Sequence, residues 1–460
     1  MNARSRSRIL LIAAALLAAL FAGAAGTRAA EPPSFVVLLA DDLGYGDLGC
    51  YGHPTIRTPS LDRMAAEGMR FTQFYCAAPV CTPSRAALLT GRLPIRSGMC
   101  GGRGVLFPDS TGGLPAEEVT IAEALKARGY RTACIGKWHL GHLPPYLPTR
   151  HGFDSYFGLP YSNDMDSPER GEPPVPLIRD EVAVEQPVDL DSLSRRYTAE
   201  AVRFIRSSAG RPFFLYLAYT FPHVPLAASP RFRGRSPRGL YGDVVEELDA
   251  SVGEVLEALR ASGRERSTLV VFTSDNGPWL SMKGDGGSAG LLRDGKGTTW
   301  EGGMRVPGIF RWPGRVPEGV TSRAVASTLD LFPTFLALAG VDLPRDRTFD
   351  GADIGPLLSG PAAGSEGPLR PFFYYEGMRL MAVRKGPWKA HLITQSWIEP
   401  GPAREHAPPL LFQLDQDPSE TEDVGKSHPQ VIEDLLGEVA RHRAGVRPVE
   451  TRLQARVAHL

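Results

Sequence analysis

The chain has 460 residues, with 51 lysines and arginines, 51 aspartates and glutamates, and a hydrophobic share of 42%. This balance is typical of a folded globular protein, and it excludes the basic surface of a nucleic-acid-binding protein and the charge-rich composition of a disordered tail. The length suffices for one large domain and a smaller one.

The first thirty residues have the pattern of a secretory signal peptide. Arg4, Arg6 and Arg8 precede an apolar run over 9–21, and small residues follow it up to Ala29. The run is short for a membrane span, and no later segment approaches the length a span needs. We therefore expect residues 1–30 to be removed and the protein to be exported to the periplasm or secreted, while a retained signal anchor stays open.

Four apolar runs predict strands that are buried on both faces of a sheet. They cover residues 35–40, 132–135, 213–219 and 268–273. Apolar residues at helical spacing lie between them, over 61–69, 120–128, 199–207 and 244–261. Alternating strands and helices predict an α/β fold with a mostly parallel central sheet flanked by helices. Ligands bind beyond the carboxyl ends of such strands, and each of these strands runs into polar residues.

The pattern changes from about residue 370. Short predicted strands at 372–375, 381–384, 389–393 and 410–414 precede a predicted helix at 432–443. This favours a small antiparallel α+β subdomain. The segment 359–367 is rich in glycine, proline, alanine and serine, so we expect a catalytic domain over 31–360 and a C-terminal subdomain over 361–460.

Two oxygen-rich pairs follow predicted strands of the sheet. Asp41 and Asp42 end the first strand, and Asp275 and Asn276 end the last. An isolated Asp-Asp pair is more often a turn or helix cap, but two such pairs at one sheet edge favour a hard divalent cation such as calcium or magnesium. The glycines at 44, 46 and 49 match a dinucleotide fingerprint, yet Asp41 and Asp42 would face its pyrophosphate; we expect them to let a loop bend around the metal.

Cys81 begins a distinctive string, Cys-Thr-Pro-Ser-Arg, which continues to Leu-Thr-Gly-Arg at 89–92. Residues 84–89 predict the first turns of a helix, with Pro83 tolerated at its start. Cys81 is thus expected just before a helix N-terminus, where free N–H groups favour anions, and Arg85 adds a fixed positive charge. A lone cysteine here would be an ordinary buried thiol; the complete string favours a functional site.

Three further segments carry candidate site residues. Lys137 and His139 are spaced so that both side chains point the same way if the segment is extended. His223 follows a predicted buried strand, and Lys296 lies between two glycines. Each residue alone would be expected on the surface. Together they offer cations that can hold an anion and imidazoles that can move a proton.

These segments together resemble the type I sulfatases, in particular the arylsulfatase A group, with the N-acetylgalactosamine-6-sulfatases as near relatives. The resemblance covers nearly all of the mature chain and rests on residues 41–54, 81–92, 136–141, 160–162 and 295–303. It implies the alkaline phosphatase-like fold. It also implies hydrolysis of sulfate monoesters, such as aryl sulfates or sulfated sugars and glycolipids, to an alcohol and inorganic sulfate.

The resemblance further implies the roles of individual residues. A formylglycine-generating enzyme would oxidise Cys81 to Cα-formylglycine, whose hydrate attacks sulfur. One calcium ion would be bound by Asp41, Asp42, Cys81, Asp275 and Asn276. The catalytic residues would be Cys81, Arg85, Lys137, His139, His223 and Lys296, and the substrate would be bound by Lys137, Ser162, His223 and Lys296.

Several alternatives stay open. The same superfamily includes hydrolases of phosphate monoesters and phosphonates, and an unconverted Cys81 would leave a protein that only binds sulfate esters. The chain has no Asn-x-Ser/Thr sequon, which makes lysosomal residence a weaker expectation. Oligomeric state and natural substrate are undetermined, and the remaining cysteines form disulfides or stay free thiols; they are Cys50, Cys76, Cys100 and Cys134.

Overall fold

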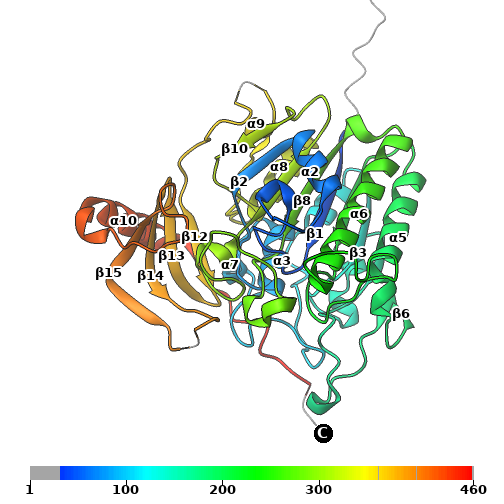
Figure 1. Cartoon of the computed structure of the whole chain (residues 1–460), viewed down its shortest axis with the longest axis horizontal. Helices are drawn as coiled ribbons and strands as arrows, with labels where there is room; N and C mark the ends of the chain where they lie inside the picture. The colour runs from blue at the N-terminus through cyan, green and yellow to red at the C-terminus, as the bar shows by residue number, and fades with distance from the viewer. Residues whose placement is uncertain (1–31, 361, 400, 458–460) are drawn as a thin grey trace, which may run out of the picture. The chain divides into compact units, whose positions relative to one another are not determined.

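The computed structural model describes residues 32–360, 362–399 and 401–457 (Figure 1). The predicted signal peptide, residues 1–30, lies outside these residues. Within them, no helix combines the length and the apolar character that crossing a membrane requires.

The larger of two sheets has eleven strands among the described residues, in the order β10-β2-β9-β8-β1-β7-β3-β4-β5-β6, with β11 also paired to β2. The strands are β1 (Ser34–Ala40), β2 (Met69–Tyr75), β3 (Arg131–Gly136), β4 (Ser155–Gly158), β5 (Leu177–Arg179), β6 (Val182–Glu185), β7 (Phe213–Ala218), β8 (Thr268–Ser274), β9 (Arg305–Arg311), β10 (Val320–Ser322) and β11 (Ala326–Ser327). The central strands β8, β1, β7, β3 and β4 are parallel, whereas β9, β5 and β6 pair antiparallel to their neighbours. The predicted α/β fold with a mostly parallel sheet is confirmed.

Strand β1 explains why the central strands are apolar along their whole length. Phe35, Val37 and Leu39 belong to the core on one face of the sheet, and Val36 and Leu38 to the core on the other. Because successive side chains point to opposite faces, a strand covered on both sides needs an apolar residue at every position.

Helices cover both faces of this sheet (Figure 1). They are α2 (Pro59–Ala66), α3 (Cys81–Thr90), α4 (Ile121–Lys126), α5 (Leu193–Ser207), α6 (Leu240–Ala261), α7 (Glu301–Met304), α8 (Leu331–Leu338) and α9 (Gly355–Leu358). The predicted helix over 61–69 ends early, because Met69 already begins β2. Helix α5 begins six residues before the predicted 199, since Leu193 and Tyr197 continue its buried face past two arginines.

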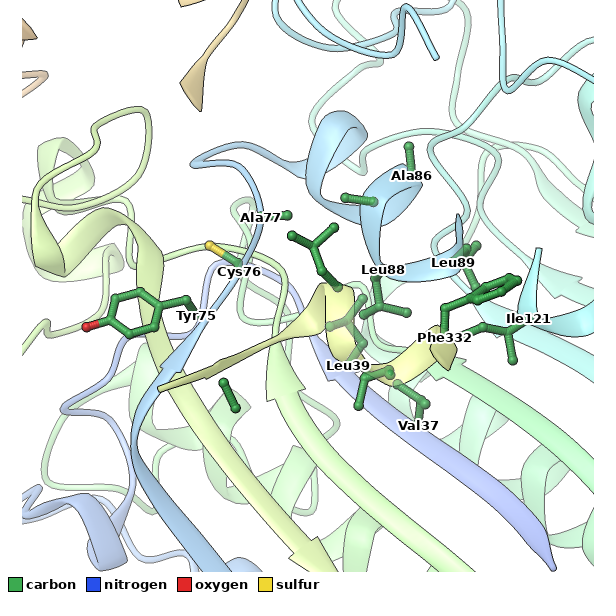
Figure 2. Packing of buried hydrophobic residues seen from close by; sticks show 14 of the residues in the cluster. Val37, Leu39, Tyr75, Cys76, Ala77, Ala86, Leu88, Leu89, Ile121 and Phe332 are labelled. Atoms are coloured by element: carbon green, nitrogen blue, oxygen red, sulfur yellow. The ribbon is translucent and has the colours of Figure 1, made fainter. Parts of the chain in front are cut away.

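Helix α3 is anchored by its apolar side chains, which lie against β1, α4 and α8 (Figure 2). The residues on this side are Leu88 and Leu89 of α3 with Val37, Leu39, Ile121 and Phe332. Cys81 was predicted to lie just before the helix, but the helix begins at Cys81 itself, so this residue occupies the first turn. The buried helix therefore gives Cys81 a fixed place at the edge of the sheet.

The C-terminal part forms a second sheet of four antiparallel strands, as predicted. Its elements are β12 (Phe372–Glu376), β13 (Arg379–Lys385), β14 (Trp388–Thr394), β15 (Arg404–Gln413) and helix α10 (Pro429–Gly445). Strand β15 begins six residues before the predicted 410. The added residues include Pro408 and Pro409, which an edge strand tolerates because its outer N–H groups need no partner. The domain boundary at 360/361 stays a prediction.

The chain beyond α10 returns to the segment 95–110. Backbone N–H groups of Val449, Arg452 and Val457 donate to carbonyls of Ile95, Gly98 and Asp109. This pairing holds in place a loop that forms one wall of the pocket described below.

Candidate active site

The polar residues that follow the central strands meet at one edge of the sheet, as the parallel topology predicts. Asp41 and Asp42 follow β1, Asp275 and Asn276 follow β8, and Lys137 follows β3. Ligand atoms of Asp41, Asp275 and Cys81 all lie within 4.8 Å of one another, and so do those of Asp42, His223 and Cys81. Residues separated by more than two hundred positions thus share one buried site.

Cys81 lies at the centre of this site and is 2% exposed. Its Sγ lies 3.6 Å from Oδ1 of Asp41 and 3.6 Å from Nζ of Lys137. Burial raises the pKa of the Cys81 thiol above its ordinary value despite the nearby lysines, Lys137 and Lys296. The thiol is therefore neutral at physiological pH, and a neutral thiol is a weak nucleophile.

Each of the three carboxylates is paired with its own cation. Nζ of Lys137 lies 2.6 Å from Asp41, Nη2 of Arg85 lies 2.8 Å from Asp275, and Nζ of Lys296 lies 2.7 Å from Asp42. Burial alone would raise the pKa of Asp41, but Lys137 and Arg85 lower it well below its usual value. Each pair combines one negative and one positive charge, so the three pairs have no net charge. This neutralisation allows so many ionised side chains to be buried together.

The residues present fit a hard cation. Oδ1 of Asn276 is buried without a hydrogen-bond donor, while its Nδ2 donates to Oδ1 of Asp42 at 2.7 Å. A buried amide oxygen without a partner, beside three carboxylates, is the donor set that calcium and magnesium prefer. Gly44 permits close loop packing, because a Cβ on it would lie 2.2 Å from the Ser288 carbonyl oxygen. That the loop glycines let the loop bend around a metal stays a prediction.

Ser162 connects two of the candidate residues. Its Oγ accepts from Nζ of Lys137 at 3.1 Å and lies 3.5 Å from Nε2 of His223. Nδ1 of His223 contacts the Val224 carbonyl, which can only accept, so Nδ1 carries a proton and Nε2 faces the site. Burial and then the charge of Lys296 lower the pKa of His223, which favours the neutral ring.

His139 presents one free ring nitrogen. Its Nε2 lies 2.8 Å from the Leu106 carbonyl and must donate, while Nδ1 is buried without a partner. Burial and the charge of Lys137 lower the pKa of His139 well below its usual value, so Nδ1 keeps its lone pair. The condition that the segment 137–139 is extended is not met at His139, which has φ 60°. The bend lets Lys137 reach Asp41 while His139 lines the pocket.

A pocket of about 410 Å³ opens onto the site. Cys81, His139, Ser162, His223 and Lys296 line it. Its other walls are mostly apolar and include Val105, Phe107, Met165, Trp279, Tyr375, Glu376 and Trp397. Asp164 and Met165 line the pocket together with residues of the C-terminal part, whereas no residue of 166–190 does. No motif marks the aromatic wall residues, since single aromatic residues usually belong to a core.

All five cysteines are free thiols in the structure. The even number that would remain after conversion of Cys81 therefore forms no disulfide here. Four of the five are buried, and a core of this size does not need covalent cross-links.

The chain is similar in sequence to known sulfatases. The sulfatase family model matches residues 33–341, and the model of the C-terminal region of aryl-sulfatase matches 367–459. Arylsulfatase A of Bos taurus is 45% identical over 449 residues, covering 90% of this chain and 87% of that protein. N-acetylgalactosamine-6-sulfatase of Rattus norvegicus is 46% identical over 443 residues, which cover 88% of this chain and 83% of that protein.

Solved structures of other proteins share the fold of this chain. A sulfatase from Pseudoalteromonas sp. superposes with a TM-score of 0.83 at 31% identity and covers 90% of each chain. The phosphonate monoester hydrolase of Agrobacterium radiobacter, at 19% identity and a TM-score of 0.62, shares the fold alone. From the matched family models and from relatives at this identity over most of the chain, we conclude that the protein belongs to the sulfatase family, whose members hydrolyse sulfate esters.

Proposed function

We propose that this sulfatase works through a formylglycine formed at Cys81, with one calcium ion, on sulfate esters of ring-shaped alcohols such as phenols and sugars. The observation that carries the proposal is the position of Cys81 at the base of the pocket, between Lys137 and Asp41. A formylglycine-generating enzyme is the maturation partner that this requires, and the predicted signal peptide would direct the enzyme to the periplasm or the medium.

The surroundings of Cys81 support conversion of the thiol. A thiol used directly as a nucleophile needs a lowered pKa, whereas burial raises the pKa of this one. The hydrated aldehyde that the family forms at this position would supply one hydroxyl that attacks sulfur and displaces the alcohol. Deprotonation of the second hydroxyl would then break the C–O bond to the sulfate, which releases sulfate and restores the aldehyde. His139 is suited to take that second proton, because its Nδ1 is a free acceptor.

The cations of the site are suited to hold the sulfate group. Nζ of Lys137 lies 3.6 Å from Sγ of Cys81, Lys296 lines the same pocket, and Ser162 lies between Lys137 and His223. A calcium ion held by Asp41, Asp42, Asp275 and Asn276 would add positive charge to a site whose ion pairs otherwise cancel. Such fixed charge favours the sulfate oxygens as the S–O bond to the leaving alcohol breaks.

His223 and Lys296 are placed to assist the leaving oxygen. Both line the pocket, and both contact Asp42, with distances of 3.6 Å from Nε2 of His223 and 2.7 Å from Nζ of Lys296. A bound sulfate ester brings a negative charge that favours protonation of His223. The protonated Nε2 can then donate to the alcohol oxygen as the ester bond breaks.

The pocket supports a ring as the leaving group. Its volume of about 410 Å³ is well beyond what a sulfate group occupies. The flat side chains of Trp279 and Trp397 form walls on which an aromatic ring or the apolar face of a sugar can stack. Asp164 and Glu376 add acceptors for hydroxyl groups.

A peptide mass tests the proposal. Tryptic peptide 71–85, from protein made in its native host, should show the mass loss that accompanies replacement of the Cys81 thiol by an aldehyde oxygen. The same preparation should release sulfate from 4-nitrophenyl sulfate much faster than phosphate from 4-nitrophenyl phosphate. An unmodified thiol would overturn the mechanism and favour a binding protein, and a preference for the phosphate ester would identify a phosphatase.

A further inference from the structure

A cluster of charged residues is buried behind the loop that carries Lys296. It comprises Glu301 at the start of α7, Lys389 and His391 of β14, and Glu420 in the loop after β15. All four side chains are fully buried, and none lines the pocket. We call these four residues the junction cluster, because they connect the large sheet to the C-terminal sheet.

Lys389 ties the loop to the C-terminal sheet. Its Nζ donates to the Thr299 carbonyl at 2.8 Å and lies 3.0 Å from Oε1 of Glu301 and 2.9 Å from Oε1 of Glu420. One ammonium group thus contacts the loop backbone and both carboxylates, and it uses all three of its protons.

Glu420 holds the loop at two further points. Its Oε2 accepts from the backbone N–H of Glu301 at 2.7 Å, and its main-chain carbonyl accepts from Nη1 of Arg293 at 2.7 Å. Its Oε1 also lies 2.7 Å from Nε2 of His391. Glu420 has φ 52°, a left-handed conformation that is costly for a residue with a side chain and persists only where the surroundings impose it.

Trp300 completes the connection. The guanidinium of Arg293 lies over its ring at 3.8 Å, and the ring of His391 lies 4.3 Å away. Arg293 and Glu301 are thus both held by Glu420, one on each side of Lys296 in the chain. Between them, the backbone of Lys296 donates to Pro278, and its Nζ reaches Asp42.

We infer that Glu420 and Lys389 are positioning residues, which hold the loop 293–301 so that the ammonium group of Lys296 meets the sulfate ester. The inference rests on the proposed role of Lys296. The C-terminal sheet then serves catalysis by keeping the Lys296 loop in its active position, in addition to forming part of the pocket wall.

A double-mutant cycle tests this inference, with sulfate release from 4-nitrophenyl sulfate as the assay. Glu420→Gln keeps the shape of the side chain but weakens its contacts with Lys389 and the Glu301 N–H. We expect it to lower kcat/KM about tenfold in the wild-type background and less than about twofold in Lys296→Met, because a residue that acts through Lys296 has nothing left to position. Equal losses in the two backgrounds, or no loss in either, would overturn the inference.

Controls separate this result from simple misfolding. Glu438→Gln removes a carboxylate that pairs with Lys385 of the same sheet, away from the junction cluster, and should leave kcat/KM unchanged. Formylglycine content is measured for every variant, so that maturation is equal in the comparison. If Glu420→Gln gives no folded protein, Lys389→Arg takes its place in the same cycle, with the same expected pattern. Wild-type protein that releases no sulfate would instead refute the proposed function.

Discussion

Nε of Arg85 donates to Oδ2 of Asp275 at 2.9 Å, and both side chains are completely buried. Nη2 of the same guanidinium lies 3.3 Å from Oδ1 of Asp41, and Nη1 donates to the Lys137 carbonyl at 2.7 Å. Arg85 therefore connects the ends of β8, β1 and β3. The planar fork of an arginine can hold three acceptors at fixed spacing, which a lysine cannot do.

Arg85→Lys is expected to disturb the proposed metal ligands. One ammonium cannot contact Asp275, Asp41 and the Lys137 carbonyl together, so the two carboxylates lose their spacing. We expect kcat/KM to fall about 100-fold and the calcium concentration for half-maximal activity to rise about tenfold. Arg311→Lys is a matched control, because Arg311 is also buried and pairs with Glu67 and Glu265 outside the site. Equal effects of the two substitutions would contradict this role.

Removal of calcium should destabilise the enzyme and stop turnover. Chelation should lower the Tm of the wild-type protein, and added calcium should restore both Tm and activity. An ion present at 100 times its Kd stabilises the folded state by about 2.7 kcal/mol. Asn276→Leu removes the unpaired amide oxygen and should reduce the calcium-dependent rise in Tm by at least half. A Tm that does not respond to chelator or calcium would rule out this site.

His151 should make the protein sensitive to acid. Both of its ring nitrogens are buried without hydrogen-bond partners, and burial lowers the pKa of His151 from 6.5 to about 4. Between these values the unfolded chain binds the proton and the folded chain does not, so stability falls as pH decreases below 6.5. The loss reaches about 2 kcal/mol at pH 5 and approaches about 3 kcal/mol near pH 4.

Urea unfolding at pH 7.5 and pH 5 can measure this effect. In His151→Phe the fall in unfolding free energy between the two pH values should be smaller by about 2 kcal/mol than in the wild type. The ring of phenylalanine keeps the packing against Trp138, whose centroid lies 6.0 Å from that of His151. An identical pH dependence in the two proteins would show that His151 has the same pKa in the folded and the unfolded chain.

Trp397→Ala should weaken substrate binding with little effect on chemistry. The Trp397 ring packs on Gly297, where an added Cβ would lie 2.0 Å from Cε2, and it forms a pocket wall beside Lys296. We expect KM for 4-nitrophenyl sulfate to rise about fivefold with kcat within about twofold of wild type. Its neighbour Ile398 is 51% exposed and does not line the pocket, so Ile398→Ala should change neither constant. A selective fall in kcat would instead assign Trp397 a part in the reaction.

Strands β9 and β2 were not predicted, because neither is a continuous apolar run. Strand β9 lies between β2 and β8 yet contains Pro307 and Gly308, which normally argue against an interior strand. Strand β2 carries polar residues at partly exposed positions, Arg70 and Thr72. In β9 the tertiary environment outweighs local propensity, because pairing and burial supply more free energy than β-propensity does. In β2 the alternation is the ordinary pattern of a half-buried strand.

The sequence alone was enough to predict the central parallel strands, the polar residues at their ends and the family, because fully buried strands require unbroken apolar runs and because motifs are local. Which distant side chains meet depends on the tertiary fold. Lys389 and Glu420 are single charged residues, and such residues are normally exposed. Each of them contacts a partner more than eighty residues away in the sequence, such as Glu301. A charged side chain can be buried only where such a partner is present.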